Sequence, residues 1–348
     1  GTRFSMAAYK NIMYFTNGVD NFFGYNGIVC TDYTGANTYK GKYIIVANDI
    51  GYILGDPSVP SSLAYTAATP ANFNTFPNVL VLDEDDSSGK GTGLANLEAT
   101  VIAFKNKKIY KVNVAAPSRT QLDYSNGGLG GRAIVRVENE LFFQNSSGIY
   151  TLAQREALQG SFRAEPLSDS IKEMFDSISD TYLENSAGIY VSDLRNVYFF
   201  VDTDNNGVND TVMVYSILNK SWTTYTGISA NEGVVWEDSL NLPYFLIASA
   251  LTGQVREIEV GTNDNGNEIN AEARTKAWNF NIPEQLKTVE GVDIFGFITE
   301  GSQIQFNILV DNEDRSGDVF VNGDNYVSGV MSGYSYGVRP LGGSTLGG

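Results

Sequence analysis

The stretch of this sequence best suited to chemistry is an oxygen-rich run, Asp202-Thr-Asp-Asn-Asn-Gly-Val-Asn-Asp210. Its candidate ligands stand at the first, third, fifth and ninth positions of the run: Asp202, Asp204, Asn206 and Asp210. Gly207 is sixth, as in loops that bind calcium, but the twelfth position is Met213, where a helix-flanked calcium loop supplies a bidentate Glu. The pattern therefore fits two structures, a calcium site that stiffens a loop or a polar hairpin turn that satisfies its own backbone groups.

Other catalytic chemistry has little to build on. The 348 residues include no His, which removes Ser-His-Asp and Cys-His systems and disfavours catalytic zinc. Cys30 is the single cysteine, so the chain has no internal disulfide. No GxxxxGK[ST] loop occurs, and Gly127-Gly-Leu-Gly-Gly131 reads as a flexible connection because no helical pattern follows it. We expect no enzyme activity and no cofactor other than calcium.

The charge balance is strongly acidic. Lys and Arg number 23 against 40 Asp and Glu, a formal net charge of −17, which disfavours general nucleic-acid binding. Two basic groups, Lys40/Lys42 and Lys105/Lys107/Lys108, fall in strand-like runs and read as solvated faces. No apolar run approaches the roughly 18 residues that cross a bilayer, so no membrane partner is expected.

Short strands must position these residues. Runs rich in Val, Ile, Tyr and Phe, such as Val197–Val201 and Thr211–Tyr215, alternate with turns rich in Asn, Gly and Ser, which is typical of many antiparallel strands. One segment, 167–178, has apolar residues at helical spacing and predicts a helix, capped by Ser168 or Ser170 with a capping box from Ser170 to Glu173.

A weak repeat organises the strands: a polar turn followed at once by an aromatic-rich strand. Its six copies begin at Lys10, Lys40, Lys105, Glu138, Leu194 and Leu240. The mean spacing is near the roughly 40 to 50 residues of a four-stranded propeller blade. We therefore predict an all-β fold, a β-propeller of short antiparallel four-stranded blades with one short helix insertion. A two-sheet sandwich is the alternative, which would need long strands or two domains at this length.

Composition changes late in the chain. The predicted division is a propeller over residues 1–275 and, over 276–348, a C-terminal β extension with a Gly-, Ser- and Tyr-rich arm. The chain begins with Gly rather than Met, which hints at a processed or excised piece of something longer.

About half of the chain resembles the tail nozzle or tail-tube-stabilising proteins of tailed bacteriophages, virion proteins built around a β-propeller. Four stretches carry the resemblance, in this order: Thr92-Gly-Leu with 101–112, 131–143 with Ser147-Gly-Ile-Tyr150, 167–171 with Met174-Phe175, and 212–225 with its Lys220-Ser-Trp222 hairpin. All four are packing and turn signatures rather than chemical motifs.

The resemblance implies a structural virion protein of the phage tail or neck. Identical copies would form a ring around the DNA path and contact other tail or neck virion proteins, and the acidic charge suits DNA that passes without sticking. Two alternatives remain open. A propeller adhesin would bind a host receptor or glycan, whereas a glycan-cleaving enzyme would use a pair of its many carboxylates, although the Ser-x-Asp-x-Gly-x-Thr-Trp repeat of sialidase propellers is absent.

Overall fold

Consecutive short strands build a series of antiparallel meanders in the first part of the chain. The computed structural model describes residues 3–33, 39–83, 89–97, 100–113, 118–123, 126–155, 161–261, 263, 267 and 269–273, and short strands between 303 and 335. The chain divides into two compact units, Gly1–Thr262 and Asn263–Gly348. The predicted boundary between residues 275 and 276 lies outside the described residues.

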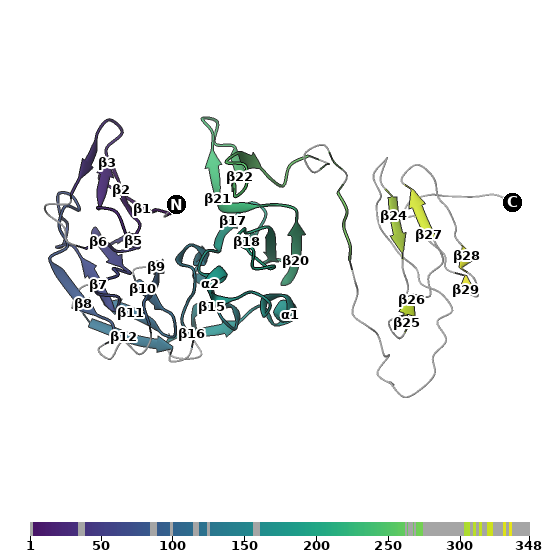
Figure 1. The fold of residues 1–348 in the computed structure, drawn as a ribbon, viewed down its shortest axis with the longest axis horizontal. Coiled ribbons are helices and arrows are strands. Elements are labelled where there is room, and N and C mark those ends of the chain that lie inside the picture. The colour runs from purple at the N-terminus through teal and green to yellow at the C-terminus, as the bar shows by residue number, and fades with distance from the viewer. Residues whose placement is uncertain are drawn as a thin grey trace. The chain divides into compact units, whose positions relative to one another are not determined.

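The first unit is a six-bladed β-propeller, as the repeat predicts (Figure 1). Blade 1 consists of β1 (Ser5–Tyr9), β2 (Ile12–Thr16), β3 (Phe23–Tyr25) and β4 (Cys30–Asp32). Blade 2 consists of β5 (Tyr43–Ala47), β6 (Ile50–Leu54), β7 (Ser62–Tyr65) and β8 (Asn78–Val81). Blade 3 consists of β9 (Gly91–Leu97), β10 (Thr100–Lys105), β11 (Ile109–Asn113) and β12 (Ser118–Asp123). Blade 4 consists of β13 (Val135–Val137), β14 (Glu140–Asn145), β15 (Gly148–Arg155) and β16 (Ser161–Pro166). Blade 5 consists of β17 (Ala187–Val191), β18 (Asn196–Val201), β19 (Thr211–Ser216) and β20 (Ser221–Thr226). Blade 6 consists of β21 (Ala230–Glu237), β22 (Pro243–Ser249) and β23 (Val255–Glu257). In the described residues the sixth blade has three strands, and no blade exchanges a strand with another.

Each of the six predicted repeat units falls in a different blade. The spacing of the units is irregular because they mark different loops: Lys10 and Glu138 stand in the turn between the first two strands of a blade, whereas Lys40 precedes a first strand and Lys105 ends a second. The tight β1–β2 turn has φ of 44° at Lys10 and 61° at Asn11, the backbone of a two-residue hairpin loop.

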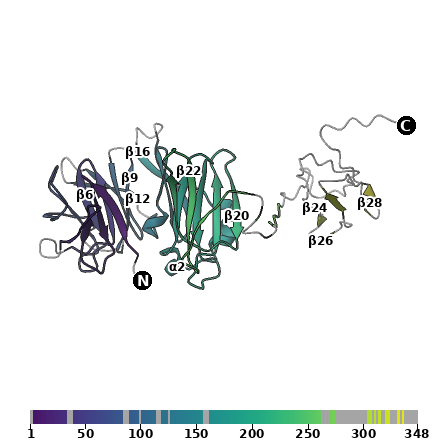
Figure 2. The ribbon, with the colours of Figure 1, turned by 90° about the horizontal axis from the view of Figure 1, so that it is seen from above.

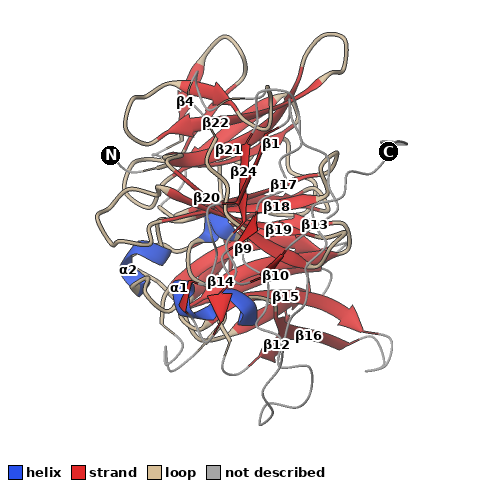
Figure 3. Ribbon diagram, turned by 90° about the vertical axis from the view of Figure 1, so that its right-hand side faces the viewer, coloured by secondary structure: helices blue, strands red, loops and turns tan. Residues whose placement is uncertain are grey.

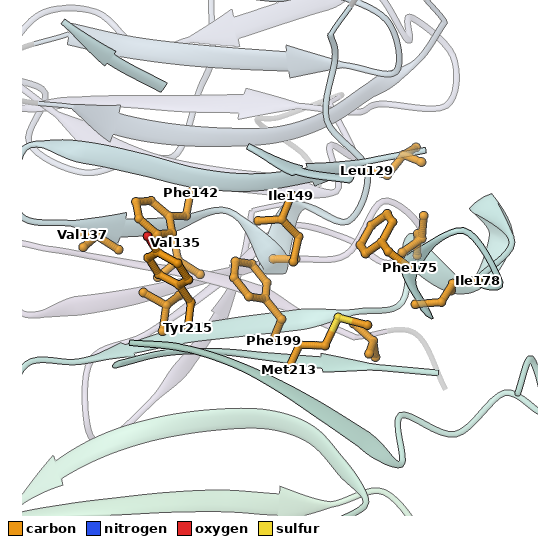
Figure 4. Packing of buried hydrophobic residues seen from close by; sticks show 14 residues of the cluster. Leu129, Val135, Val137, Phe142, Ile149, Phe175, Ile178, Phe199, Met213 and Tyr215 are labelled. Atoms are coloured by element: carbon orange, nitrogen blue, oxygen red, sulfur yellow. The ribbon is translucent and has the colours of Figure 1, made fainter. Parts of the chain in front are cut away.

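The core lies between neighbouring blades, and β18 shows how it forms. Alternate side chains of a strand point to opposite faces. Val197 and Phe199 pack toward blade 4, whereas Tyr198 and Phe200 pack toward blade 6, and all four are buried. Figure 4 shows the first of these interfaces, where Phe199 lies among residues of blades 4 and 5 and Phe175. Viewed from above, the strands of successive blades stand side by side (Figure 2).

The short helix predicted over 167–178 is present but shorter than predicted, because the segment forms a 3-10 turn followed directly by a short α-helix (Figure 3). The two elements are η3 (Asp169–Ile171) and α1 (Lys172–Phe175). α2 (Asp180–Leu183) follows the segment, and another 3-10 turn, η1 (Gly131–Ala133), precedes β13. Ser179 is extended, with ψ of 151°, and this ends the helical path. Ser168 precedes η3 but does not cap it, because its hydroxyl accepts the N–H of Ile149 at 2.8 Å, and Ile171 rather than Ser170 precedes α1. No helix of the described residues is long and apolar enough to cross a bilayer.

The two ends of the arc of blades meet through polar contacts. Among the described strands none of blade 1 pairs with one of blade 6. Arg3, just before β1, donates to the Asn185 carbonyl oxygen at 2.9 Å and to the amide oxygen of Asn231 in β21. Sheet pairing therefore does not seal the ring in the described part of the chain.

The second unit contains short antiparallel strand pairs, the C-terminal β extension that the sequence predicts. Its strands are β24 (Gln303–Phe306), β25 (Leu309–Val310), β26 (Glu313–Asp314), β27 (Val319–Asn322), β28 (Val330–Met331) and β29 (Tyr334–Ser335). β24 pairs with β27, β25 with β26, and β28 with β29. Most of the predicted terminal arm lies outside the described residues.

The glycine-rich stretch between β12 and β13 is closely packed, so it is not the flexible connection that its composition suggests. Gly128 N–H donates to the Lys105 carbonyl oxygen at 2.9 Å. A Cβ on Gly127 would collide with the backbone of Lys105 and Asn106, whereas one on Gly128 would meet the Phe104 ring at 2.9 Å.

We predict that Gly127→Ala lowers the free energy of unfolding by about 3 kcal/mol, because backbone atoms cannot yield to the new methyl group. Gly128→Ala is the matched control, with a loss of about 1 kcal/mol, because a side chain can shift. Urea unfolding of both variants measures the difference. Equal losses would contradict close backbone packing at Gly127.

Candidate functional site

The predicted calcium ligands form a hairpin turn between β18 and β19 that is closed largely by its own donors. The Asp202 carboxylate accepts the backbone N–H groups of Asn206 at 3.1 Å and Gly207 at 2.6 Å. Asp204 accepts the side-chain amide of Asn206 at 2.9 Å, and the Asn206 amide oxygen accepts the N–H of Val208 at 2.8 Å. Most of the side-chain oxygens that calcium would need are therefore already hydrogen-bonded within the turn.

Asp210 stands apart from this network. Among the described residues its carboxylate accepts a single long contact, 3.4 Å, from the Thr211 hydroxyl. Burial raises the pKa of Asp202, and the nearby Asp204 raises it further, although the two N–H donors oppose the shift. No group of three His, Cys, Asp or Glu in the described residues is arranged to hold a metal ion. Calcium binding at this turn stays a prediction from the sequence.

Three of the five basic residues, Lys40, Lys42 and Lys107, are exposed as the sequence indicates, whereas Lys105 and Lys108 are not. Lys105 is fully buried, and its ammonium donates to the Ser61 hydroxyl. Lys108 is mostly buried and pairs with Asp83 at 3.1 Å. Lys42 comes directly before β5, the first strand of blade 2, and has other charged residues near it. The sequence pattern did not predict the burial of Lys105 and Lys108, because successive residues of a strand point to opposite faces of its sheet.

In the described part of the chain, the first and last blades each carry an apolar sheet face that no other blade covers. The blade-1 face is the side of that blade turned away from blade 2. It carries six apolar or aromatic residues: Phe4, Met6, Met13, Phe15, Phe23 and Tyr25. The Phe15 and Phe23 rings stack at 4.8 Å, and Phe4 meets Phe23 edge-on at 5.6 Å. Met6 is nevertheless 59% exposed.

The blade-6 face is the corresponding side turned away from blade 5. Its residues are Val234, Trp236, Tyr244, Leu246 and Val255. Trp236 packs against Tyr244 with ring centroids 5.6 Å apart, yet 53% of Trp236 is exposed. Exposed apolar residues gathered on one face mark interaction surfaces more often than scattered ones do. One sequence signal was available for blade 1: β1 and β2 are apolar on both faces, as buried strands are.

Comparison with known proteins shows no family for this chain. No family model matches it, and neither does any curated protein. Virginiamycin B lyase from Staphylococcus aureus is 9% identical over 75% of this chain and 85% of its own, with a TM-score of 0.47. An ancestral GH74 enzyme is 12% identical over 74% of this chain and 43% of its own, with a TM-score of 0.46. PorZ is a surface component of the type-IX secretion system of Porphyromonas gingivalis. It is 12% identical over 76% of this chain and 33% of its own, with a TM-score of 0.42.

We predict that Asp202→Ala lowers the free energy of unfolding by about 1–3 kcal/mol, because two backbone N–H groups lose their acceptor. Asp210→Ala, the matched control in the same turn, changes it by less than about 0.5 kcal/mol. Thermal melts of the unaltered chain in calcium and in chelator decide between the two structures, and coinciding curves would support the hairpin turn. A rise in its melting temperature with calcium that Asp202→Ala abolishes would instead establish the calcium loop.

Proposed function

We propose that this chain is a non-enzymatic structural protein of a tailed-phage particle, a propeller that joins identical copies in the tail or neck. The observation that carries the proposal is the pair of uncovered apolar faces on blades 1 and 6. Its placement in a virion rests on the sequence resemblance to phage nozzle propellers.

The two faces are unlike the rest of the propeller. Every internal blade covers both sides of its sheet with neighbours, as β18 does with blades 4 and 6. The terminal blades cover one side each. Apolar area left in water forgoes about 25 cal/mol per Å², so burial of these faces against another chain favours association.

A second copy of this chain is the occupant we favour. A formal charge of −17 makes copies repel one another, so contact requires charge-poor surface. The apolar residues of both faces are uncharged, and acidic residues border them: Asp32 lies opposite Phe23 on the blade-1 face, and Glu257 lies opposite Leu246 on the blade-6 face. Because the two faces differ, contact between blade 1 of one copy and blade 6 of the next is heterologous, and such contacts close into rings when the rotation permits.

The remaining parts of the proposal follow from the sequence. DNA would be a passing polymer that the acidic chain repels rather than a ligand. Other tail or neck virion proteins would contact the ring.

We predict that the purified chain associates, and that Trp236→Lys weakens the association about tenfold or more, because a buried Trp is a frequent centre of binding energy. Leu218→Lys is the matched control: Leu218 is 71% exposed and lies in the β19–β20 turn, outside both faces. Light scattering over a dilution series measures both variants. A chain that stays monomeric at every concentration contradicts the proposal, and a monomer that binds host polysaccharide supports the adhesin alternative.

A further inference from the structure

Six charged residues stand at the beginnings of the innermost strands, one from each blade. Arg3 precedes β1, Lys42 precedes β5, Lys90 precedes β9, Arg132 lies in η1 ahead of β13, Glu184 precedes β17, and Glu232 lies near the start of β21. The first strands of neighbouring blades contact one another around the propeller axis. These six residues, the axial cluster, therefore gather at one end of the axis.

Ion pairing within the axial cluster is incomplete. Lys90 pairs with Glu184 at 2.8 Å, and Arg132 pairs with Glu232 at 3.4 Å. In the part of the chain that the structure describes, neither Arg3 nor Lys42 has a carboxylate within ion-pair distance. The Lys42 ammonium instead lies 5.5 Å from the centroid of the Tyr43 ring. Four cations against two carboxylates leave the axial cluster with two excess positive charges, in a chain whose total is strongly negative.

One carbonyl oxygen holds two of these cations close together. Arg3 donates to the Asn185 carbonyl oxygen at 2.9 Å, and Arg132 donates to the same atom at 3.1 Å. Asn209 also donates to it, at 3.2 Å. Two guanidinium groups that share an acceptor repel each other, and an anion between them would relieve that repulsion.

The pKa values have the direction that excess positive charge produces. Burial lowers the pKa of Arg3, and the charge of Arg132 lowers it further, whereas the charge of Glu232 raises it. Partial removal from water lowers the pKa of Lys42; Glu184 opposes this, while Lys90, Arg132 and Arg3 add to it. The charged forms are thus held in a place that an anion would stabilise.

Two buried hydroxyls lie close in sequence to residues of the axial cluster. Thr92 follows Lys90 by two residues, Ser186 follows Glu184 by two residues, and they are 2% and 0% exposed. Neither side-chain oxygen has a hydrogen-bond partner among the described residues. Buried polar groups are nearly always paired, so two hydroxyls without a partner are unusual in this part of the fold.

We infer that the axial cluster binds a small oxyanion, the phosphate or carboxylate group of a soluble ligand. Arg3 and Lys42 supply the uncompensated charge, and Arg132 and Lys90 add donors from their ion pairs. Guanidinium groups suit this ligand because their planar N–H donors match the oxygens of phosphate and carboxylate.

The test uses the full chain and its variant Lys42→Gln, with inorganic phosphate and citrate as probes at constant ionic strength. Lys42 donates no hydrogen bond in the described structure, so its replacement should leave the melting temperature of the free protein unchanged or raised. Lys40→Gln is the matched control, because Lys40 is exposed and its ammonium donates to the Val19 carbonyl oxygen at 3.3 Å, outside the axial cluster.

We expect at least one probe to bind in calorimetric titration, with Lys42→Gln about tenfold weaker and Lys40→Gln unchanged, since a hydrogen bond to a charged group is worth at least that factor. Binding of phosphate alone or of citrate alone identifies which oxyanion the site takes. If neither probe binds more than chloride does, or if the two variants lose equal affinity, the inference is overturned.

Discussion

The structure depends on one constraint: a short four-stranded sheet must cover both of its faces, and only a neighbouring blade can do this. β18 meets the requirement, with Phe199 buried on one side and Phe200 on the other. Small antiparallel sheets are marginal alone because they bury too little apolar area. Radial stacking solves the problem for the internal blades and leaves it unsolved at the two ends of the arc. The blade-1 face and the blade-6 face are what remains.

In the described residues, polar contacts rather than strand pairing connect the first blade to the last. Arg3 reaches Asn185 and Asn231 from the start of β1, so one side chain links blade 1 to residues of blades 5 and 6. A partly exposed contact of this kind contributes less than an interleaved strand would. The junction is therefore the place where the propeller can accept another chain.

Much of the fold is visible in the sequence, because strand alternation and turn residues are local signals. The repeat that begins at Lys10 or Glu138 marks blades since each blade needs the same hairpin. The helix over 167–178 is shorter than predicted because apolar spacing at Ile171 and Phe175 also suits short helical turns that pack onto a blade.

The sites were harder to predict than the strands, because they depend on contacts between distant blades. Nothing near Arg3 in the sequence points to Asn231, and the spacing of Lys42 and Lys90 has no motif. Which face of β1 stays uncovered also depends on where the arc ends. The oxygen-rich run at Asp202 was easy to find, yet its hydrogen bonds lie mostly within the turn.

The central claim is that another chain covers the terminal blades, and amide hydrogen exchange across a concentration series tests it most directly. Exchange in β1–β3 and β21–β23 should slow as concentration rises, while exchange in β10, β14 and β18 stays constant. Exchange in the terminal blades that is independent of concentration would contradict the account.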